Sequence, residues 1–233
     1  MGRLPVASAV INLFDLADPE RRLALAYARS DAREDLLSLF LLDERLGAIV
    51  AATKEAMLGE IRLTWWRDAV RGLADKAPPD EPLLQRLFSV VQKGACSADR
   101  LAAIAEGWGM LLSDPPVDED MLIRHGEERG SALFRAAADV LGRPQADVGA
   151  AGSIWALTDL AFRSNDDEIS TRALALARKQ LSAAKRGHWP ASLRPLAIMM
   201  ALARLDLKSS SRKRSQGAPQ RIVRAIWAGL TGR

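Results

Sequence analysis

Helix-length segments separated by prolines fill this sequence, and no segment shows the period-two alternation of apolar and polar residues that a half-buried strand requires. Pro78-Pro79 and Pro115-Pro116 interrupt the helical pattern, because proline lacks a backbone N–H and clashes with the preceding turn. The sequence therefore predicts an all-α protein, folded as a single helical bundle. The expected helices span about 19–30, 32–53, 55–75, 82–94, 98–113, 118–141, 146–164, 167–187, 194–206 and 220–230.

The cysteine and histidine content limits which disulfides and metal sites this chain can form. The single cysteine, Cys96, excludes an internal disulfide and a cysteine-based zinc site, and it indicates a reducing compartment. His125 and His188 are far apart in the chain, and we expect His125 at the surface or half-buried. No apolar run reaches the roughly 18 residues of a membrane span, and the N-terminus lacks the apolar core of a signal peptide. We expect a cytoplasmic protein, with peripheral membrane contact as an option.

Positive charge gathers at the C-terminal end, although the net charge is only +4. The pattern predicts three parts: a helical domain at 1–207, a basic flexible linker at 208–219 and a C-terminal amphipathic helix at 220–233. Ile222, Ile226, Trp227 and Leu230 share one side of that helix, which either docks on the bundle or binds a membrane surface. We favour docking, which would bury Trp227, because so short a helix is marginal alone in water. Nucleic-acid binding ranks last, since no recognised module accompanies the basic residues.

Two adjacent tryptophans, Trp65 and Trp66, mark the stretch 58–70. Leu58, Ile61 and Trp65 recur at i, i+3 and i+7, and Trp66 and Val70 extend that face. The pattern predicts a core helix with a wide apolar face, in which both tryptophans are substantially buried.

Residues 20–75 resemble the N-terminal part of the squalene/phytoene synthase family. Arg33, a leucine-rich run and the "lg.iRl.wWrd" stretch follow in the family's order and spacing, and the resemblance covers about residues 18–207. It implies a bundle of the isoprenoid synthase type. The residues that carry the family motif are Leu58, Gly59, Arg62, Trp65, Trp66 and Arg67.

The resemblance also implies where catalysis would occur. Active members join two prenyl diphosphates, which they hold through Mg²⁺ on two DxxxD motifs. The i, i+4 spacing places both carboxylates of a motif on one helical face, directed at the leaving group. In this chain the first motif falls at Gly47 and Ala51, which cannot bind a metal. The second falls at Arg163 and Asp167, where a cation replaces one carboxylate. We therefore expect no catalytic residue and no metal ligand.

The charged residues near these positions allow two interpretations. Asp159, Arg163 and Asp167 form an ion-pair ladder on an exposed face, or Arg163 points into a cavity and meets an anionic ligand directly. Asp43 and Glu44 lie one turn before the lost first motif, and we expect them on a solvated face rather than as substitute metal ligands. Arg33 and Arg62 suit either an anion contact or an ion pair at a helix end or between helices.

The leading hypothesis is a catalytically inactive squalene/phytoene synthase-like protein that acts as a binding or assembly factor. A branch of the family without the aspartate motifs is associated with assembly of respiratory complex I, and the resemblance implies that role here. The partners would be another protein and an isoprenoid or lipid ligand, with no cofactor. The alternative is an active prenyl transferase that condenses isoprenyl diphosphates head to head with Mg²⁺.

Overall fold

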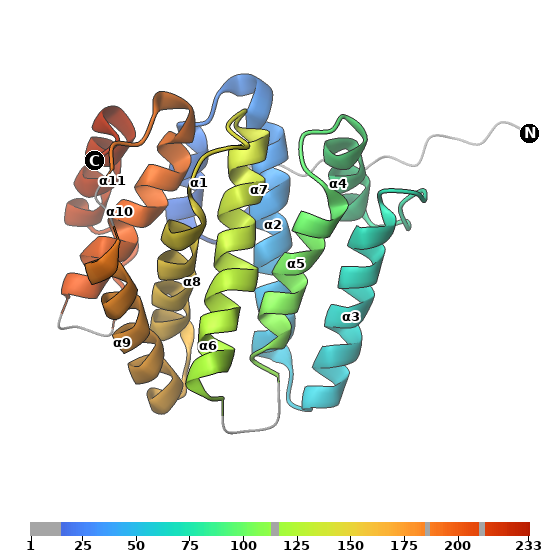
Figure 1. Cartoon of the computed structure of the whole chain (residues 1–233), viewed down its shortest axis with the longest axis horizontal. Coiled ribbons are helices and arrows are strands. Elements are labelled where there is room, and N and C mark those ends of the chain that lie inside the picture. The colour runs from blue at the N-terminus through green and yellow to red at the C-terminus, as the bar shows by residue number, and fades with distance from the viewer. Residues whose placement is uncertain (1–14, 113–116, 185–186, 210–212) are drawn as a thin grey trace, which may run out of the picture.

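The structure is a computed structural model that describes residues 15–112, 117–184, 187–209 and 213–233. Its helices stand side by side, with α3 at one edge of the bundle and α9 to α11 at the other (Figure 1). The described residues contain no strand, which confirms the all-α prediction. The elements are α1 (Pro19–Ala26), α2 (Ser30–Ala52), α3 (Ala56–Gly72), α4 (Pro82–Gln92), α5 (Ala98–Gly109), α6 (Glu119–His125), the π-helix η2 (Gly126–Ser131), α7 (Ala132–Val140), α8 (Gly149–Arg163), α9 (Asp167–Ala183), the 3₁₀ turn η3 (Ala191–Leu193), α10 (Arg194–Lys208) and α11 (Pro219–Thr231).

Local sequence explains where several helices begin. Asp18 precedes α1 and its carboxylate accepts from the backbone N–H of Glu20 at 2.8 Å, while Pro19 occupies the first helical position. Asp118 and Asp166 cap α6 and α9 in the same manner. These caps satisfy backbone donors that a helix leaves unpaired in its first turn.

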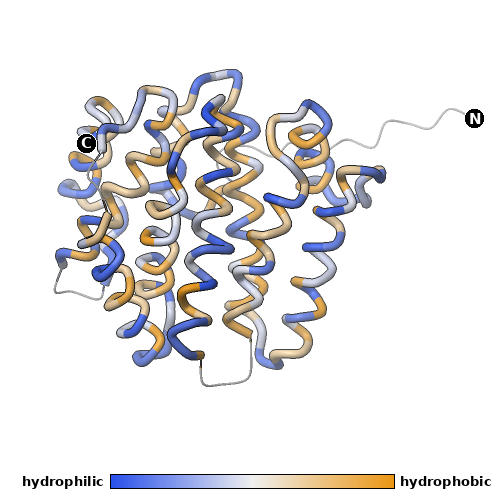
Figure 2. The backbone as a smooth tube through the Cα atoms, in the orientation of Figure 1, coloured by the Kyte–Doolittle hydropathy of each residue, from blue (hydrophilic) through white to orange (hydrophobic). Residues whose placement is uncertain are grey.

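The core lies between α2, α5, α7 and α10. Hydrophobic and hydrophilic residues alternate along the helices (Figure 2). Leu36 and Phe40 of α2 are fully buried in the core. Helix η2 packs closely on α8, where a Cβ added to Gly130 would lie only 2.2 Å from the carbonyl oxygen of Gly152. Glycine at both positions lets the two backbones touch.

The tryptophan pair is divided between core and surface. Trp66 is 6% exposed, as predicted, but Trp65 is 48% exposed, so the prediction for Trp65 was wrong. The two indoles meet edge to face with centroids 5.4 Å apart. Helix α3 lies at the edge of the bundle, and the side that it turns inward carries Gly59, Leu63, Trp66 and Val70. The stripe of Leu58, Ile61 and Trp65 therefore faces outward, because neighbouring residues lie about 100° apart on a helix.

The C-terminal helix forms as predicted but turns its apolar side away from the bundle. Helix α11 packs against α10 and α1, yet Trp227 is 56% exposed, so the expectation that docking buries this tryptophan was wrong. Within the expected linker, residues 210–212 lie outside the described part, and Arg214 is held by ion pairs to the bundle. The linker's mobility stays a prediction. No described helix has the length and apolar character needed to cross a membrane.

Candidate functional site

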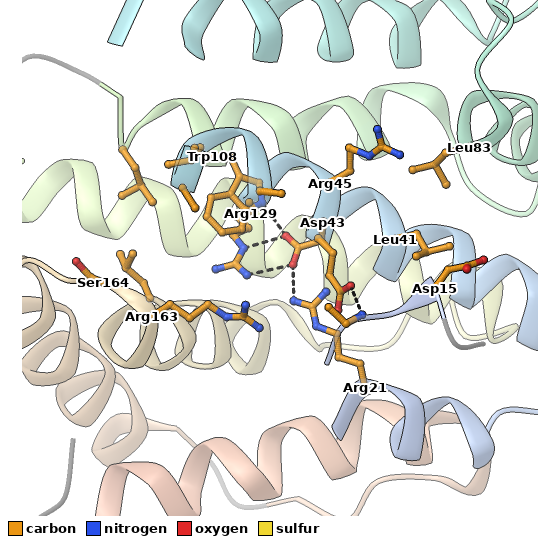
Figure 3. A pocket seen from close by; sticks show the side chains of 18 of the residues that line it. Asp15, Arg21, Leu41, Asp43, Arg45, Leu83, Trp108, Arg129, Arg163 and Ser164 are labelled. Atoms are coloured by element: carbon orange, nitrogen blue, oxygen red, sulfur yellow. Dashed lines mark hydrogen bonds and ion pairs between the residues drawn. The ribbon is translucent and has the colours of Figure 1, made fainter. Parts of the chain in front are cut away.

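A cavity of about 1060 Å³ opens between α2, α5, η2 and α8 (Figure 3). Gly47, Ala51 and Arg163, which the family resemblance assigns to the two motifs, all line it, whereas Asp167 does not. Asp167 is the first residue of α9, beyond the end of α8 at Arg163, so it cannot continue the i, i+4 row of Asp159 and Arg163. The wall is largely apolar and includes Leu41, Val50, Leu83, Leu111, Leu160 and Ile169.

Asp43 forms the centre of a buried ion-pair cluster at this cavity. Arg129 approaches it with two nitrogens, Nε at 2.9 Å and Nη2 at 3.0 Å, and Arg21 Nη2 lies at 2.6 Å. The indole N–H of Trp108 donates to the same carboxylate at 2.8 Å. These side chains point toward one another in Figure 3. The expectation of a solvated face was wrong for Asp43, which has no exposed surface. Glu44 is half-buried and accepts from the backbone N–H of Ala17 and Asp18 at 2.8 and 3.2 Å.

Asp159 is the second carboxylate of the cluster, and it is also buried. Arg129 Nη2 lies 2.7 Å from it, Arg163 Nε 2.8 Å and Arg214 Nη1 3.1 Å. The pairing of Asp159 with Arg163 was anticipated, but its place on an exposed face was wrong. Asp43 and Asp159 each stand one helical turn before a lost motif position, Gly47 and Arg163 respectively. Arg129 thus joins carboxylates from α2 and α8, beside the positions that the family resemblance assigns to the two motifs.

Arginine neighbours keep both carboxylates ionised despite burial. Burial by itself would raise the pKa of Asp43, but the charges of Arg129 and Arg21 outweigh it and hold the pKa well below its usual range. Burial likewise opposes ionisation of Asp159, and Arg163, Arg129 and Arg214 lower its pKa strongly. The cluster therefore contains full charges that compensate one another internally.

Aromatic rings cover the faces of the arginines. The guanidinium carbon of Arg129 lies 3.9 Å from the centroid of Trp108 and 4.9 Å from that of Trp155. Arg21 lies 5.2 Å from the Trp155 centroid. A planar guanidinium can stack on a ring while its edge donates to carboxylates, which an ammonium cannot do. The rings therefore exclude water from the ion pairs.

His125 belongs to the same cluster, and the expectation of a surface or half-buried position was wrong. It is fully buried; its Nδ1 donates to the carbonyl of Gly107 at 2.7 Å, and its Nε2 lies 3.5 Å from Arg129 Nη1. Burial, together with the positive charge of Arg129, lowers the pKa of His125 to about 3. This imidazole is neutral at physiological pH and serves as an acceptor beside Arg129.

The π-helix η2 explains how Arg129 reaches its partners. The helix expected at 118–141 is present as α6, η2 and α7, with a wide turn at Gly126–Ser131. A π-turn inserts one extra residue and redirects the side chains that follow. The sequence did not point to Arg129, Arg21, Trp108 and Arg214. Arginines are mostly exposed, and no local pattern links Trp108 or Arg214 to residues so far away in the chain. The only local signal was glycine at 126 and 130 within a helical pattern.

The remaining candidate residues lie away from the cavity. Arg33 is exposed and donates to the carbonyl of Ala28 at 3.1 Å, near the end of α1, and Arg62 is exposed on α3. Arg67 pairs with the adjacent Asp68. None of the family-motif residues on α3, which are Leu58, Gly59, Arg62, Trp65, Trp66 and Arg67, lines the cavity.

The donor set does not fit the Mg²⁺ ions that active members of the family use. Mg²⁺ requires near-octahedral oxygen ligands, and the carboxylate oxygens nearest to the lost motifs already accept from arginines. Gly47 offers no ligand atom, and a Cβ there would lie 2.8 Å from the ring of Trp108. No group of three or more metal-ligating side chains occurs within the described ranges.

Comparison with known families agrees with this architecture. A bundle of helices around an apolar cavity, with facing charged positions on α2 and α8, defines a protein of the isoprenoid synthase type. The family model for squalene/phytoene synthase matches residues 15–161, and the chain belongs to that family. No curated protein and no solved structure matches the chain.

Proposed function

We propose that this chain is a catalytically inactive squalene/phytoene synthase-like protein that binds an uncharged isoprenoid or similar lipid in its cavity without a metal. The observation that carries the proposal is Arg129, which contacts both Asp43 and Asp159. A protein cation thereby occupies the position between two helices that a metal–diphosphate pair would need.

The energetics of the cluster disfavour a metal-bound diphosphate. To ligate Mg²⁺, Asp43 or Asp159 would have to release an arginine that is itself buried. Breaking a buried ion pair and leaving one charge uncompensated costs roughly 3–5 kcal/mol. The cluster also has little net positive charge to offer an anion. Arg21 and Arg129 are matched by Asp43 and Asp159. The other two arginines, Arg163 and Arg214, also pair with Asp18 and Asp206.

The shape and lining of the cavity support an apolar ligand. Its volume of about 1060 Å³ lies at the upper end of the usual range for small-molecule sites, roughly 300–1,000 Å³. Leu41, Val50, Leu111 and Leu160 supply apolar surface, while Arg163 stands at one side and remains partly exposed. An isoprenoid alcohol or hydrocarbon would bury its chain there without requiring a charged partner.

Calorimetry separates this proposal from the transferase alternative. Farnesol should bind with equal affinity in Mg²⁺ and in EDTA, and farnesyl diphosphate should show no metal-dependent gain. Replacement of Ala51 by Phe, at an exposed position that lines the cavity, should weaken farnesol binding without unfolding the protein. An Ala74→Phe variant, outside the cavity lining, provides the control. Micromolar binding of farnesyl diphosphate that disappears in EDTA would support the active enzyme instead.

An assembly role is the second part of the proposal, and respiratory complex I is the target that the family resemblance implies. The metal-free cluster supports it only by removing the competing enzymatic role. Deletion of the chain from its cell should lower the amount of assembled complex I, and the Arg129→Lys variant should restore it less well than the native chain. Unchanged complex I after deletion would exclude this partner.

A further inference from the structure

Helix α11 is attached to the bundle through its polar and small side chains. The guanidinium of buried Arg221 lies between two acidic partners, with Nη2 2.8 Å from Glu20 of α1 and 3.4 Å from Asp206 of α10. Gly229 packs so tightly on Tyr27 that an added Cβ would lie 2.4 Å from the ring. The orientation of α11 about its own axis is therefore fixed by an ion pair and by a glycine contact.

This attachment leaves the apolar side of α11 exposed. At 100° per residue, the exposed apolar side chains cover a continuous arc of about 140° on one side of the helix. Helix α11 itself lies at the edge of the bundle opposite α3 in Figure 1. The exposed fractions of these apolar side chains are 41% for Ile222, 67% for Val223, 39% for Ile226, 56% for Trp227 and 67% for Leu230. So large a one-sided apolar surface indicates an interaction site.

Charge around α11 points to an anionic partner. Residues 207–233 contain no aspartate or glutamate, but they contain Lys208, Arg212, Lys213, Arg214, Arg221, Arg224 and Arg233. Arg214 and Arg221 are engaged in ion pairs with the bundle. Lys208 and Arg233 are exposed, and Arg224 is half-buried at the border of the apolar arc.

The second exposed apolar stripe, on α3, differs in charge. Met57, Leu58, Ile61 and Trp65 are exposed there to a similar degree. Glu55, Glu60 and Asp68 accompany them, so acidic and basic residues are mixed along this helix. Of these two stripes on the described part of the chain, the one on α11 combines an apolar arc with an excess of cations.

We propose that α11 is an interfacial helix that lies on the surface of an anionic phospholipid bilayer. A helix with an apolar arc, flanking cations and a tryptophan is suited to the boundary between headgroups and acyl chains. Trp227 places an amphipathic indole at that depth, and the basic residues meet the lipid phosphates. Since Arg221 fixes α11 to α1 and α10, the whole bundle would be held in one orientation on the membrane. This inference concerns a surface separate from the cavity and does not depend on the proposed ligand.

Vesicle flotation of the intact protein tests the inference. Vesicles of phosphatidylcholine with about 30% phosphatidylserine should carry the protein, and vesicles of phosphatidylcholine alone should carry much less. Binding should fall at least about tenfold when the ionic strength rises from about 0.05 to 0.5 M, because the Debye length shortens. The emission of Trp227 should shift to the blue on binding, and a Trp227→Phe variant should lose that shift while it retains binding.

Paired variants on α11 and α3 test whether vesicle binding depends on the apolar arc of α11. The double variant Trp227→Glu/Leu230→Glu should lose at least about tenfold in vesicle affinity, with an unchanged circular dichroism spectrum because both side chains are exposed. The double variant Ile61→Glu/Trp65→Glu on α3 should bind as the native chain does. Equal loss in both variants, or no vesicle binding by the native chain, would overturn the proposal. So would a native dimer that the α11 variant converts to a monomer without any vesicle binding, since the face would then serve self-association.

Discussion

Arg129 and Asp43 form a two-point ion pair, with distances of 2.9 and 3.0 Å, and neither side chain has appreciable contact with solvent. The same guanidinium reaches Asp159, so one residue of the π-helix η2 ties α2 to α8. This arrangement joins two helices of the bundle through buried ion pairs, and it underlies the first two predictions.

Replacement of Asp43 by Asn should destabilise the fold by about 3–5 kcal/mol, because Arg129 and Arg21 would keep buried charges without a matched anion. The free energy of unfolding, measured by urea denaturation, reports the loss. The control is Asp31→Asn, which removes the partner of Arg29 at an exposed pair and should change stability little. An Asp43→Asn variant as stable as the native chain would show that Arg129 and Arg21 do not need the charge of Asp43.

His125 should make stability depend on pH between about 6.5 and 4.5. Its pKa in the folded protein is lowered to about 3, so in this window the unfolded chain binds a proton that the native state does not. The free energy of unfolding should therefore fall as the pH falls, by up to about 1.4 kcal/mol per pH unit.

The His125→Asn variant should lose this slope while its amide retains a donor for the carbonyl of Gly107. His188→Asn serves as the control, because His188 is exposed and its removal should leave the slope in place. Thermal melts of the three proteins across this pH range provide the measurement, and an identical slope in His125→Asn would contradict the prediction.

Replacement of Trp65 and of Trp66 by alanine should change the free energy of unfolding by different amounts. Trp66→Ala should cost about 3–5 kcal/mol, as for other buried aromatic residues, because it opens a void between α3 and α5. Trp65→Ala should cost much less, since about half of that side chain already faces solvent. Chemical denaturation of both variants measures the free energy of unfolding. Equal losses of stability would show that Trp65 contributes to the core as much as Trp66 does.

Restoring the first aspartate motif should fail at one of its two positions. Gly47→Asp should destabilise the fold by at least about 1–3 kcal/mol, because its Cβ would meet Trp108 at 2.8 Å. Ala51→Asp should be tolerated, since Ala51 is exposed at the cavity. Neither variant should gain Mg²⁺ affinity in calorimetry. A stable Gly47→Asp protein that binds Mg²⁺ would show that the cluster can rearrange to admit metal.

Much of the architecture was determined by local sequence. Proline breaks such as Pro78-Pro79 and the capping aspartate Asp18 act within a few residues, so they predict helix positions without knowledge of the partners. The assignment of Gly47 and Arg163 to the two motifs came from the resemblance to the family, and it stays a prediction. The absence of motif carboxylates at these positions needed no tertiary information.

Tertiary structure alone decided which side of each amphipathic helix became buried and which charges met. Trp65 faces outward because α3 lies at the edge of the bundle, and Trp227 faces outward because Arg221 and Gly229 determine how α11 docks. Arg129 is 86 residues from Asp43 and 30 from Asp159 in the chain, and helical periodicity carries no information about pairs so distant. A buried ion cluster depends on the mutual positions of four or more helices, and these positions are set by packing of the whole fold rather than by any one segment.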